Sequence, residues 1–209
     1  MKKVLILINS SGGLCDFRGE FVEALCAEYE VWVSMPDDVK EQELVDMGCH
    51  IVQTPINRRG INPLEDLKLY RAYGKIMKDL CPSLVVTYTI KPNIYGGFAA
   101  GMRKIPYIAT ITGLGGAFDR TGLLLKLIVG MYRAGLKRAA CVFFQNEENR
   151  GIFQRMGIKA KKTRMVMGSG VSLKKHTYEP YPERDKTHFL FVGRVMKERG
   201  ILEYIEAAE

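Results

Sequence analysis

The sequence lacks several patterns that would mark particular classes of protein. Its five cysteines form no C-x-x-C pair, and its three histidines lie far apart without the spacing of metal ligands. We therefore expect reduced thiols and no bound metal. The most apolar window, residues 123–131, is interrupted by Lys126 and is too short to span a membrane. No signal-peptide cleavage site follows the first residues, so we expect a cytoplasmic protein.

Acidic residues are in the minority, since 31 Lys and Arg face 23 Asp and Glu, which gives a net charge of +8. Nucleic acid, an anionic membrane surface or phosphorylated substrates would each explain this excess. The basic residues are spread along the chain, and neither a recognition helix nor an aromatic-basic motif stands out. Nucleic acid is the weakest of the three explanations, and we expect no nucleic-acid partner.

The first residues predict a strand, a glycine-rich turn and a helix. Residues 2–9 form a short apolar run rich in β-branched side chains, and the polar cluster 10–13 ends it. Beyond the turn, Phe17, Phe21 and Leu25 recur every four residues. This spacing predicts a helix that turns those three side chains toward a sheet.

The turn itself contains Gly12 and Gly13, and Asp16 is the expected N-cap of the helix that follows. In parallel α/β domains, ligands bind beyond the carboxyl ends of the strands, where backbone amides attract phosphate. The turn does not fit the dinucleotide fingerprint G-x-G-x-x-G. A phosphate site and a tight connection without a ligand are both consistent with it.

The rest of the chain alternates between short apolar runs and amphipathic segments. With 209 residues, it has room for one sizeable α/β domain. Seven strands that alternate with helices predict a doubly wound parallel sheet, which is a Rossmann-like α/β fold. The further strands are expected at 30–34, 50–54, 83–88, 106–112, 140–145 and 163–167, and the helices at 36–47, 63–80, 95–102, 123–138 and 147–156.

Two loops on the carboxyl side of the predicted sheet carry basic or amide side chains. The loop after the third strand contains Arg58 and Arg59, and either contact with an anionic group or a solvated loop would explain them. The loop at 89–93 follows the fourth strand, and Pro92 is expected to exclude a helix before it. A second glycine-rich turn, 113–116, follows the fifth strand at the same edge.

The composition changes after Ser172. Residues 173–186 contain two prolines, several charges and no periodicity, as an interdomain linker would. Residues 187–194 predict a new strand, and a helix begins at 201. We therefore expect a first domain at 1–172 and the first βα unit of a second α/β domain at 187–209. The alternative is that 187–194 adds an edge strand to the first sheet.

Six short segments spread over the whole chain match the motifs of one family. They are residues 11–13, 88–96, 110–115, 143–146, 168–171 and 191–200. Together they resemble the GT-B glycosyltransferases, and within them family 4, the retaining enzymes that include capsular and lipopolysaccharide transferases. The resemblance implies two Rossmann-like domains, of which 1–172 is the N-terminal, acceptor-side domain and 187–209 the start of the donor-binding domain.

The resemblance also implies which residues act on the leaving group. Arg194 matches the arginine that neutralises the leaving diphosphate in the family. Arg199 stands where the family usually has a lysine, which changes reach and geometry but keeps the charge. Two fixed cations can stabilise the departing nucleotide without a metal.

On the first domain, the resemblance implies that Gly12 and Gly13 face a phosphate or the transferred sugar of a sugar nucleotide, expected to be UDP- or GDP-linked. Gly113 lies in the second glycine turn at the same edge. Thr112 stands where many members carry histidine, so only a hydrogen bond is expected from it. The sugar nucleotide is a substrate, and no further cofactor is expected.

Acceptor binding is implied for Arg58, Arg59, Lys91 and Asn93, which lie on the loops of the first domain. The implied acceptor is a polyprenyl-diphosphate-linked or other saccharide, in cell-surface polysaccharide synthesis. A lipid-linked acceptor would bring the protein to the inner face of the membrane as a peripheral contact. It would also account for the basic excess.

Alternatives remain open at this stage. The helix at 123–138 carries Lys126, Arg133 and Lys137 on one side, opposite a broad apolar stripe. A solvated basic face is the favoured explanation, and a membrane-binding face is the alternative. The chain could also be a stand-alone module that binds a phosphorylated ligand or nucleic acid without catalysis. A nonhydrolysing sugar-nucleotide epimerase on the same two-domain plan is a third candidate, with fewer matching motifs.

Overall fold

The computed structural model describes residues 1–58, 60, 62–115, 118, 122–174, 176–183, 185–193, 195 and 197–208. The chain divides into two compact units, Met1–Val171 and Ser172–Glu209.

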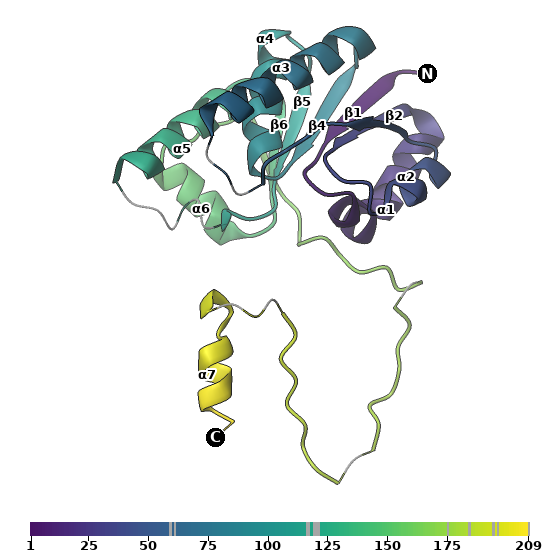
Figure 1. The fold of residues 1–209 in the computed structure, drawn as a ribbon, viewed down its shortest axis with the longest axis vertical. Helices are drawn as coiled ribbons and strands as arrows, with labels where there is room; N and C mark the ends of the chain where they lie inside the picture. The colour runs from purple at the N-terminus through teal and green to yellow at the C-terminus, as the bar shows by residue number, and fades with distance from the viewer. Residues whose placement is uncertain are drawn as a thin grey trace. The chain divides into compact units, whose positions relative to one another are not determined.

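The first unit is built on a parallel sheet of seven strands in the order β3-β2-β1-β4-β5-β6-β7 (Figure 1). Every neighbouring pair is parallel. The predicted doubly wound α/β fold is therefore confirmed. The strands are β1 Lys3–Leu7, β2 Glu30–Met35, β3 His50–Gln53, β4 Leu84–Tyr88, β5 Tyr107–Ile111, β6 Cys141–Phe144 and β7 Thr163–Met165.

The helices connect these strands. In the first unit they are α1 Ser11–Glu28, α2 Glu41–Asp46, α3 Pro63–Leu80, the π-helix η1 Pro92–Gly96, α4 Gly97–Met102, α5 Gly122–Leu136 and α6 Glu147–Arg155. The second unit contains the 3₁₀ turn η3 Lys197–Arg199 and α7 Ile201–Glu206.

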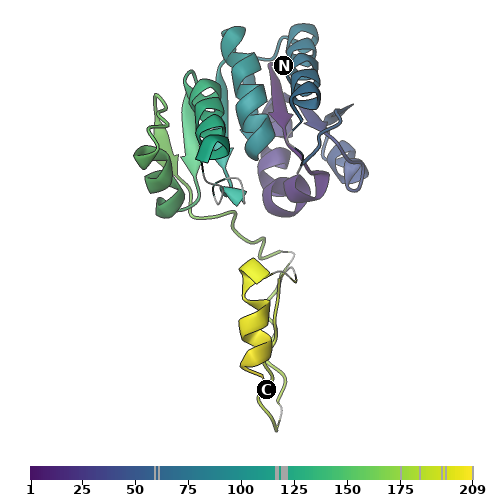
Figure 2. The ribbon, with the colours of Figure 1, turned by 60° about the vertical axis from the view of Figure 1, so that its left-hand side comes forward.

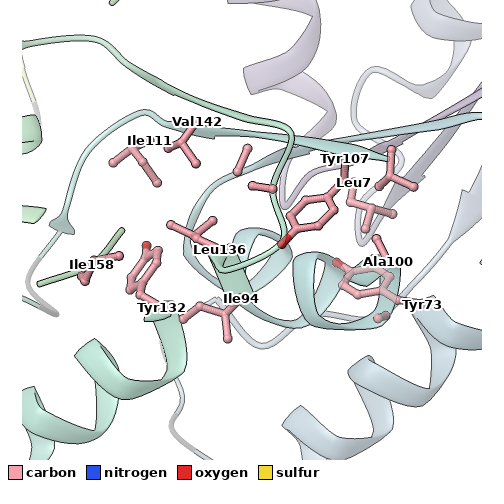
Figure 3. Packing of buried hydrophobic residues seen from close by; sticks show 14 of the residues in the cluster. Leu7, Tyr73, Ile94, Ala100, Tyr107, Ile111, Tyr132, Leu136, Val142 and Ile158 are labelled. Atoms are coloured by element: carbon pink, nitrogen blue, oxygen red, sulfur yellow. The ribbon is translucent and has the colours of Figure 1, made fainter. Parts of the chain in front are cut away.

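The two faces of the sheet form two cores, because successive side chains of a strand point to opposite faces. Leu5 and Leu7 of β1 pack with the face covered by α3, α4, α5 and α6, whereas Val4 and Ile6 pack under α1 and α2. Figure 2 shows the helices in front of and behind the sheet. Figure 3 shows the first core, where the ring of Tyr107 lies close to Leu7.

Helix α1 begins earlier and faces differently from the prediction. Its N-cap is Ser10, whose hydroxyl accepts a hydrogen bond from the amide of Gly13, and not Asp16. The buried side of α1 includes Leu14 and Val22, while Phe17 and Phe21 are 59% and 42% exposed. The four-residue spacing correctly predicted a helix, but the smaller side chains Leu14 and Val22, and not the two phenylalanines, pack against the sheet.

Helix α3 starts at the capping residue predicted for it, and helix α2 does not. Asn62 caps α3 with Pro63 at its first turn, as predicted, and accepts from the amide of Leu64 at 3.1 Å. The helix expected from residue 36 instead starts at Glu41. Asp37 does not cap that helix because its carboxylate binds the start of α1.

The segment around Pro92 was predicted as a loop, which is wrong. Ile90 and Lys91 are already helical, with Lys91 at φ −66° and ψ −45°, and η1 and α4 continue from them. A proline in the first turn of a helix loses no hydrogen bond, because the first amides have no partner within the helix. An ion pair of Lys91 with α3 further holds this residue in place.

Helices α4 and α5 meet closely because glycines lie at their crossing. A Cβ added at Gly97 would lie 2.4 Å from the carbonyl oxygen of Gly135. One added at Gly135 would lie 2.8 Å from the carbonyl oxygen of Ile94. Real side chains do not tolerate such distances, so this crossing requires glycine on both helices.

The second unit contains no strand among the described residues 187–193, although one was predicted at 187–194. This segment does not join the seven-stranded sheet either, so it has no neighbouring strand to bond with. The hydroxyl of Tyr204 on α7 donates to the carbonyl of Phe189 at 2.9 Å, which ties α7 to the segment. The division into a linker at 173–186 and a second domain from 187 stays a prediction.

Candidate functional site

The carboxyl ends of the parallel strands, together with the residues that follow them, form one edge of the first unit, which we call the rim. In open α/β sheets this is the edge where ligands bind. Its members discussed below are Ser11, Gly12, Gly13, Arg18, Asp37, Arg58, Tyr88, Thr89, Lys91, Thr112, Gly113, Gln145 and Ser169.

At the start of α1, a carboxylate already occupies part of the expected phosphate position. Asp37 accepts from the amide of Ser11 at 3.0 Å, from the Ser11 hydroxyl and from the guanidinium of Arg58. The charge of Arg58 is therefore balanced within the fold. Among the described residues, none accepts a hydrogen bond from the amide of Gly12, so this donor of the first turn is available to a ligand.

The rim glycines are not required by neighbouring atoms. A Cβ added at Gly12 or Gly13 would find its nearest neighbour at 3.8 or 3.6 Å, which is ordinary contact. One added at Gly113 would meet nothing within 4 Å. None of these three glycines has a positive φ. The fold itself therefore does not explain glycine here, whereas a ligand that approaches the backbone closely would.

Lys91 is paired as well. Its ammonium group lies 2.6 Å from a carboxylate oxygen of Asp66 on α3, and both side chains are largely buried, at 14% and 12% exposure. The other oxygen of Asp66 accepts from the hydroxyl of Tyr95 at 2.9 Å. Burial, and then the bond to Asp66, raise the pKa of Tyr95. Lys91 thus fastens η1 to α3, and its charge is neutralised where it stands.

Asn93 is 1% exposed and lies beneath the rim. Its amide oxygen accepts from the hydroxyl of Thr87 at 2.6 Å, and its amide nitrogen donates to the carbonyl of Thr110 at 2.9 Å. Asn93 therefore holds η1 against the ends of β4 and β5. This geometry gives no support to the predicted direct contact between Asn93 and an acceptor.

Arg18 of α1 reaches across the rim, and sequence reasoning missed it. Its guanidinium lies 5.2 Å from the centre of the Tyr88 ring, at the end of β4, and donates to the carbonyl of Phe17 at 2.9 Å. With the Gln145 amide in the orientation that suits its neighbours, the Gln145 oxygen accepts from Arg18 at 2.8 Å and from the hydroxyl of Ser169 at 3.1 Å.

Thr89, directly after Tyr88, has a strained backbone. Its φ is +69°, in the left-handed region that β-branched residues avoid. Its side-chain hydroxyl is buried and has no hydrogen-bond partner among the described residues. Strain and unsatisfied polar atoms often occur together at functional sites. No feature of the sequence signals either property.

The remaining predicted site residues are placed as follows. Thr112 is exposed, and its carbonyl accepts from the Gln145 amide at 3.3 Å in the same orientation. Arg199 lies exposed in η3 of the second unit. Arg59 and Arg194 lie outside the described residues. The roles predicted for these four residues stay predictions.

No group of three or more His, Cys, Asp or Glu side chains among the described residues could hold a metal ion. None of the helices formed by these residues is both long and apolar enough to cross a membrane.

The fold and the rim define a Rossmann-like domain of the GT-B type, with an open ligand edge above the central strands. Residues 3–146 match the glycosyl transferase 4-like family. Because this match covers more than half of the chain, the protein belongs to that family, as the resemblance predicted.

A Campylobacter jejuni protein, N,N'-diacetylbacillosaminyl-diphospho-undecaprenol alpha-1,3-N-acetylgalactosaminyltransferase, is 27% identical over 225 residues, which cover 99% of this chain and 60% of the relative. The structure of Anabaena Alr3699/HepE with UDP and glucose matches with a TM-score of 0.61 at 15% identity, over 86% of this chain and 48% of the other. MurG of Acinetobacter baumannii matches with a TM-score of 0.53 at 18% identity, over 89% and 48%. The chain thus spans 60% of the length of this relative and about half of these structures.

Proposed function

We propose that this chain is the acceptor-side part of a retaining glycosyltransferase, which moves a sugar from a nucleotide-diphosphate donor to a polyprenyl-diphosphate-linked or other saccharide. The family match carries the proposal. The likeness to a Campylobacter jejuni transferase, which is named for an undecaprenol-linked diphosphate substrate, supports the same activity. The rim glycines are consistent with the proposal, because no neighbouring atom of the chain requires glycine at Gly12, Gly13 or Gly113.

In this proposal the chemistry of the leaving group belongs to the second domain. Breaking the bond between sugar and phosphate leaves negative charge on the nucleotide, which Arg194 and Arg199 would stabilise. The first unit would hold the acceptor against the donor sugar, which lowers the barrier by orientation. The donor nucleotide is proposed to be UDP or GDP.

The alternatives are less well supported. A stand-alone binding module would not explain a transferase relative that aligns with nearly the whole chain. An epimerase on the same two-domain plan would share the fold, so the fold alone does not separate the two. The family match and the transferase relative favour sugar transfer.

A screen of sugar nucleotides against the full-length protein tests this proposal. A true donor raises the midpoint of thermal unfolding by linkage, in proportion to its affinity and concentration. The donor that binds is then incubated with a polyprenyl-diphosphate-linked saccharide, and the product is analysed for transfer and for the configuration at the anomeric carbon. A product in which the transferred sugar has the opposite anomeric configuration from the donor would contradict the retaining mechanism. Epimerised donor without transfer would favour the epimerase.

We also propose a peripheral contact between α5 and an anionic membrane. Leu123 and Leu127 are 84% and 55% exposed, and Lys126 is exposed beside them. Arg133, which the sequence placed on the same basic face, instead donates to the carbonyl of Met156 and secures the end of α6. Replacement of Lys126 and Leu127 by Glu should abolish sedimentation with phosphatidylserine vesicles. Unchanged sedimentation would leave α5 with a solvated face only.

A further inference from the structure

The positive charges at the rim differ in whether an acidic side chain balances them. Arg58 pairs with Asp37, and Lys91 pairs with Asp66. The ion pairs among the described residues do not include Arg18. Among the described residues, Arg18 contacts the side chain of Tyr88, the Phe17 carbonyl and the Gln145 amide oxygen, which are all uncharged.

These three contacts hold the guanidinium in place without cancelling its charge. A guanidinium has five N–H groups, so contact with the Tyr88 ring and bonds to two neutral oxygens leave further N–H groups for a ligand. Burial raises the pKa of Tyr88, and the positive charge of Arg18 partly offsets this rise. An uncompensated, preorganised cation of this kind is suited to a planar or tetrahedral oxyanion.

The surroundings of Arg18 also indicate a ligand. Gly12, on the same helix, has an amide for which the described residues provide no acceptor, and a Cβ added there would make only ordinary contacts. Thr89, next to Tyr88, combines a left-handed backbone with a buried hydroxyl that lacks a partner. Both features lie at the rim, and neither improves the packing of the unliganded chain.

We propose that Arg18 is the anion-binding residue of the rim and receives a diphosphate group of a substrate. The identification of the anion as a substrate diphosphate rests on the proposed function. The shared chemistry is the diphosphate, which either the sugar nucleotide or the polyprenyl-linked acceptor carries. Arg18 acts by binding and positions the substrate. Gln145 and Tyr88 orient the guanidinium.

Titration of the 209-residue chain with inorganic pyrophosphate, followed by calorimetry and by phosphorus NMR, tests the proposal. Arg18→Gln should weaken binding about tenfold or more, as the loss of a charge-assisted contact implies. Arg18→Lys should weaken binding less, because lysine keeps the positive charge and loses only the paired N–H groups of the guanidinium. Arg71→Gln, a change of the same charge at an exposed position of α3, is the matched control and should bind like the parent.

The same titrations with UDP and with geranyl diphosphate separate the two sources of the anion. A loss on Arg18→Gln for UDP alone assigns the site to the donor, and a loss for geranyl diphosphate alone assigns it to the acceptor. Equal pyrophosphate binding by the parent and Arg18→Gln, or none by the parent, overturns the proposal. So does unchanged binding of both larger ligands.

Thermal unfolding of each variant shows whether a loss of binding reflects a loss of structure. If Arg18→Gln does not fold, Arg18→Lys alone must lower the affinity for pyrophosphate while leaving the salt dependence of binding unchanged, because the charge is kept and only the paired N–H geometry is lost. Failure of the donor screen on the full-length protein would reject the transferase and leave the pyrophosphate result intact. The two proposals therefore fail separately.

Discussion

The glycines at the crossing of α4 and α5 and the glycines at the rim differ in what surrounds them. At the crossing, an added Cβ on Gly97 or Gly135 would lie 2.4 or 2.8 Å from a backbone oxygen. At the rim, the nearest atom to a Cβ on Gly12 would lie 3.8 Å away, and one on Gly113 would have no neighbour within 4 Å. The fold requires glycine at the first pair and does not require it at the second.

The same contrast holds for polar groups. At the crossing, the hydroxyl of Tyr107 donates to the carbonyl of Gly135 at 2.6 Å within a closed core. At the rim, the amide of Gly12 has no acceptor among the described residues, and the same holds for the Thr89 hydroxyl. The hydroxyl of Tyr73 in the same core also lacks a partner among the described residues, so the contrast rests on the particular groups at the crossing and at the rim. This contrast predicts which substitutions affect stability and which affect binding.

The largest loss of stability is expected from Gly97→Ala. The added methyl group would collide with a backbone carbonyl on α5, which cannot rotate away as a side chain could. We expect a loss of about 3 kcal/mol in the free energy of unfolding, measured with urea. Gly130→Ala on α5, where an added Cβ meets nothing within 4 Å, is the control and should stabilise by up to about 1 kcal/mol. Similar free energies of unfolding for the two variants would show that the close contact at Gly97 does not require glycine.

Asp66→Asn should have the next largest effect. It leaves the ammonium group of Lys91 without its carboxylate in a largely buried position. We expect a loss of about 2 kcal/mol, less than for a fully buried pair because some water reaches it. Asp79→Asn, an exposed change on the same helix, should stay within about 0.5 kcal/mol. An unchanged urea midpoint for Asp66→Asn would mean that η1 does not depend on this pair.

Tyr107→Phe should cost about 1 kcal/mol at neutral pH, because the carbonyl of Gly135 loses a donor. Burial raises the pKa of Tyr107 to about 12 from its ordinary value of 10.0. The unfolded chain therefore loses this proton before the folded chain does. Stability that is fully present below pH 10 falls as the pH rises toward 12. Tyr107→Phe should lose less stability across this interval than the parent, in urea unfolding at several pH values, and an identical slope would contradict the assignment.

Gly12→Ala should have the smallest effect on stability, within about 0.5 kcal/mol, since its φ is ordinary and its surroundings are open. Binding should respond instead. We expect the full-length protein to lose donor-induced thermal stabilisation in this variant, because the methyl group occupies space that a phosphate or sugar would use. If Gly12→Ala destabilises the chain as Gly97→Ala does, the rim glycines are structural and the comparison fails.

Hydrophobic periodicity and capping residues predicted most of the fold. The strands, the seven-stranded parallel sheet and the start of α3 at Asn62 follow from local patterns. Gly12, Gly13 and Gly113 were correctly assigned to one edge of the sheet, because the carboxyl ends of parallel strands share it. The separate turn predicted at 10–13 was wrong, since Gly12 and Gly13 already lie in the first turn of α1. The correctly predicted features depend on residues that are close in the sequence.

The contacts at the rim could not be predicted in the same way. Arg58 and Asp37 are 21 residues apart, and Lys91 and Asp66 are 25 apart, so their pairing depends on the finished fold. Nothing in the sequence distinguishes Arg18 from a solvated arginine of a helix, because its contact with the Tyr88 ring depends on the folded chain. Whether an acidic side chain balances a cation at the rim therefore depends on residues far away in the sequence, and the residue type of the cation does not reveal it.

The π-helix η1, Pro92–Gly96, restricts where the chain can gain or lose a residue. A wide turn holds one residue more than an α-helical turn, and it sets the angular phase between Lys91, which binds α3, and Gly97, which meets α5. A single-codon deletion here would restore a regular helix and rotate everything after it by about 100°. One of the two attachments would then be lost. Insertions and deletions should therefore be rarer in this segment during evolution than amino-acid replacements.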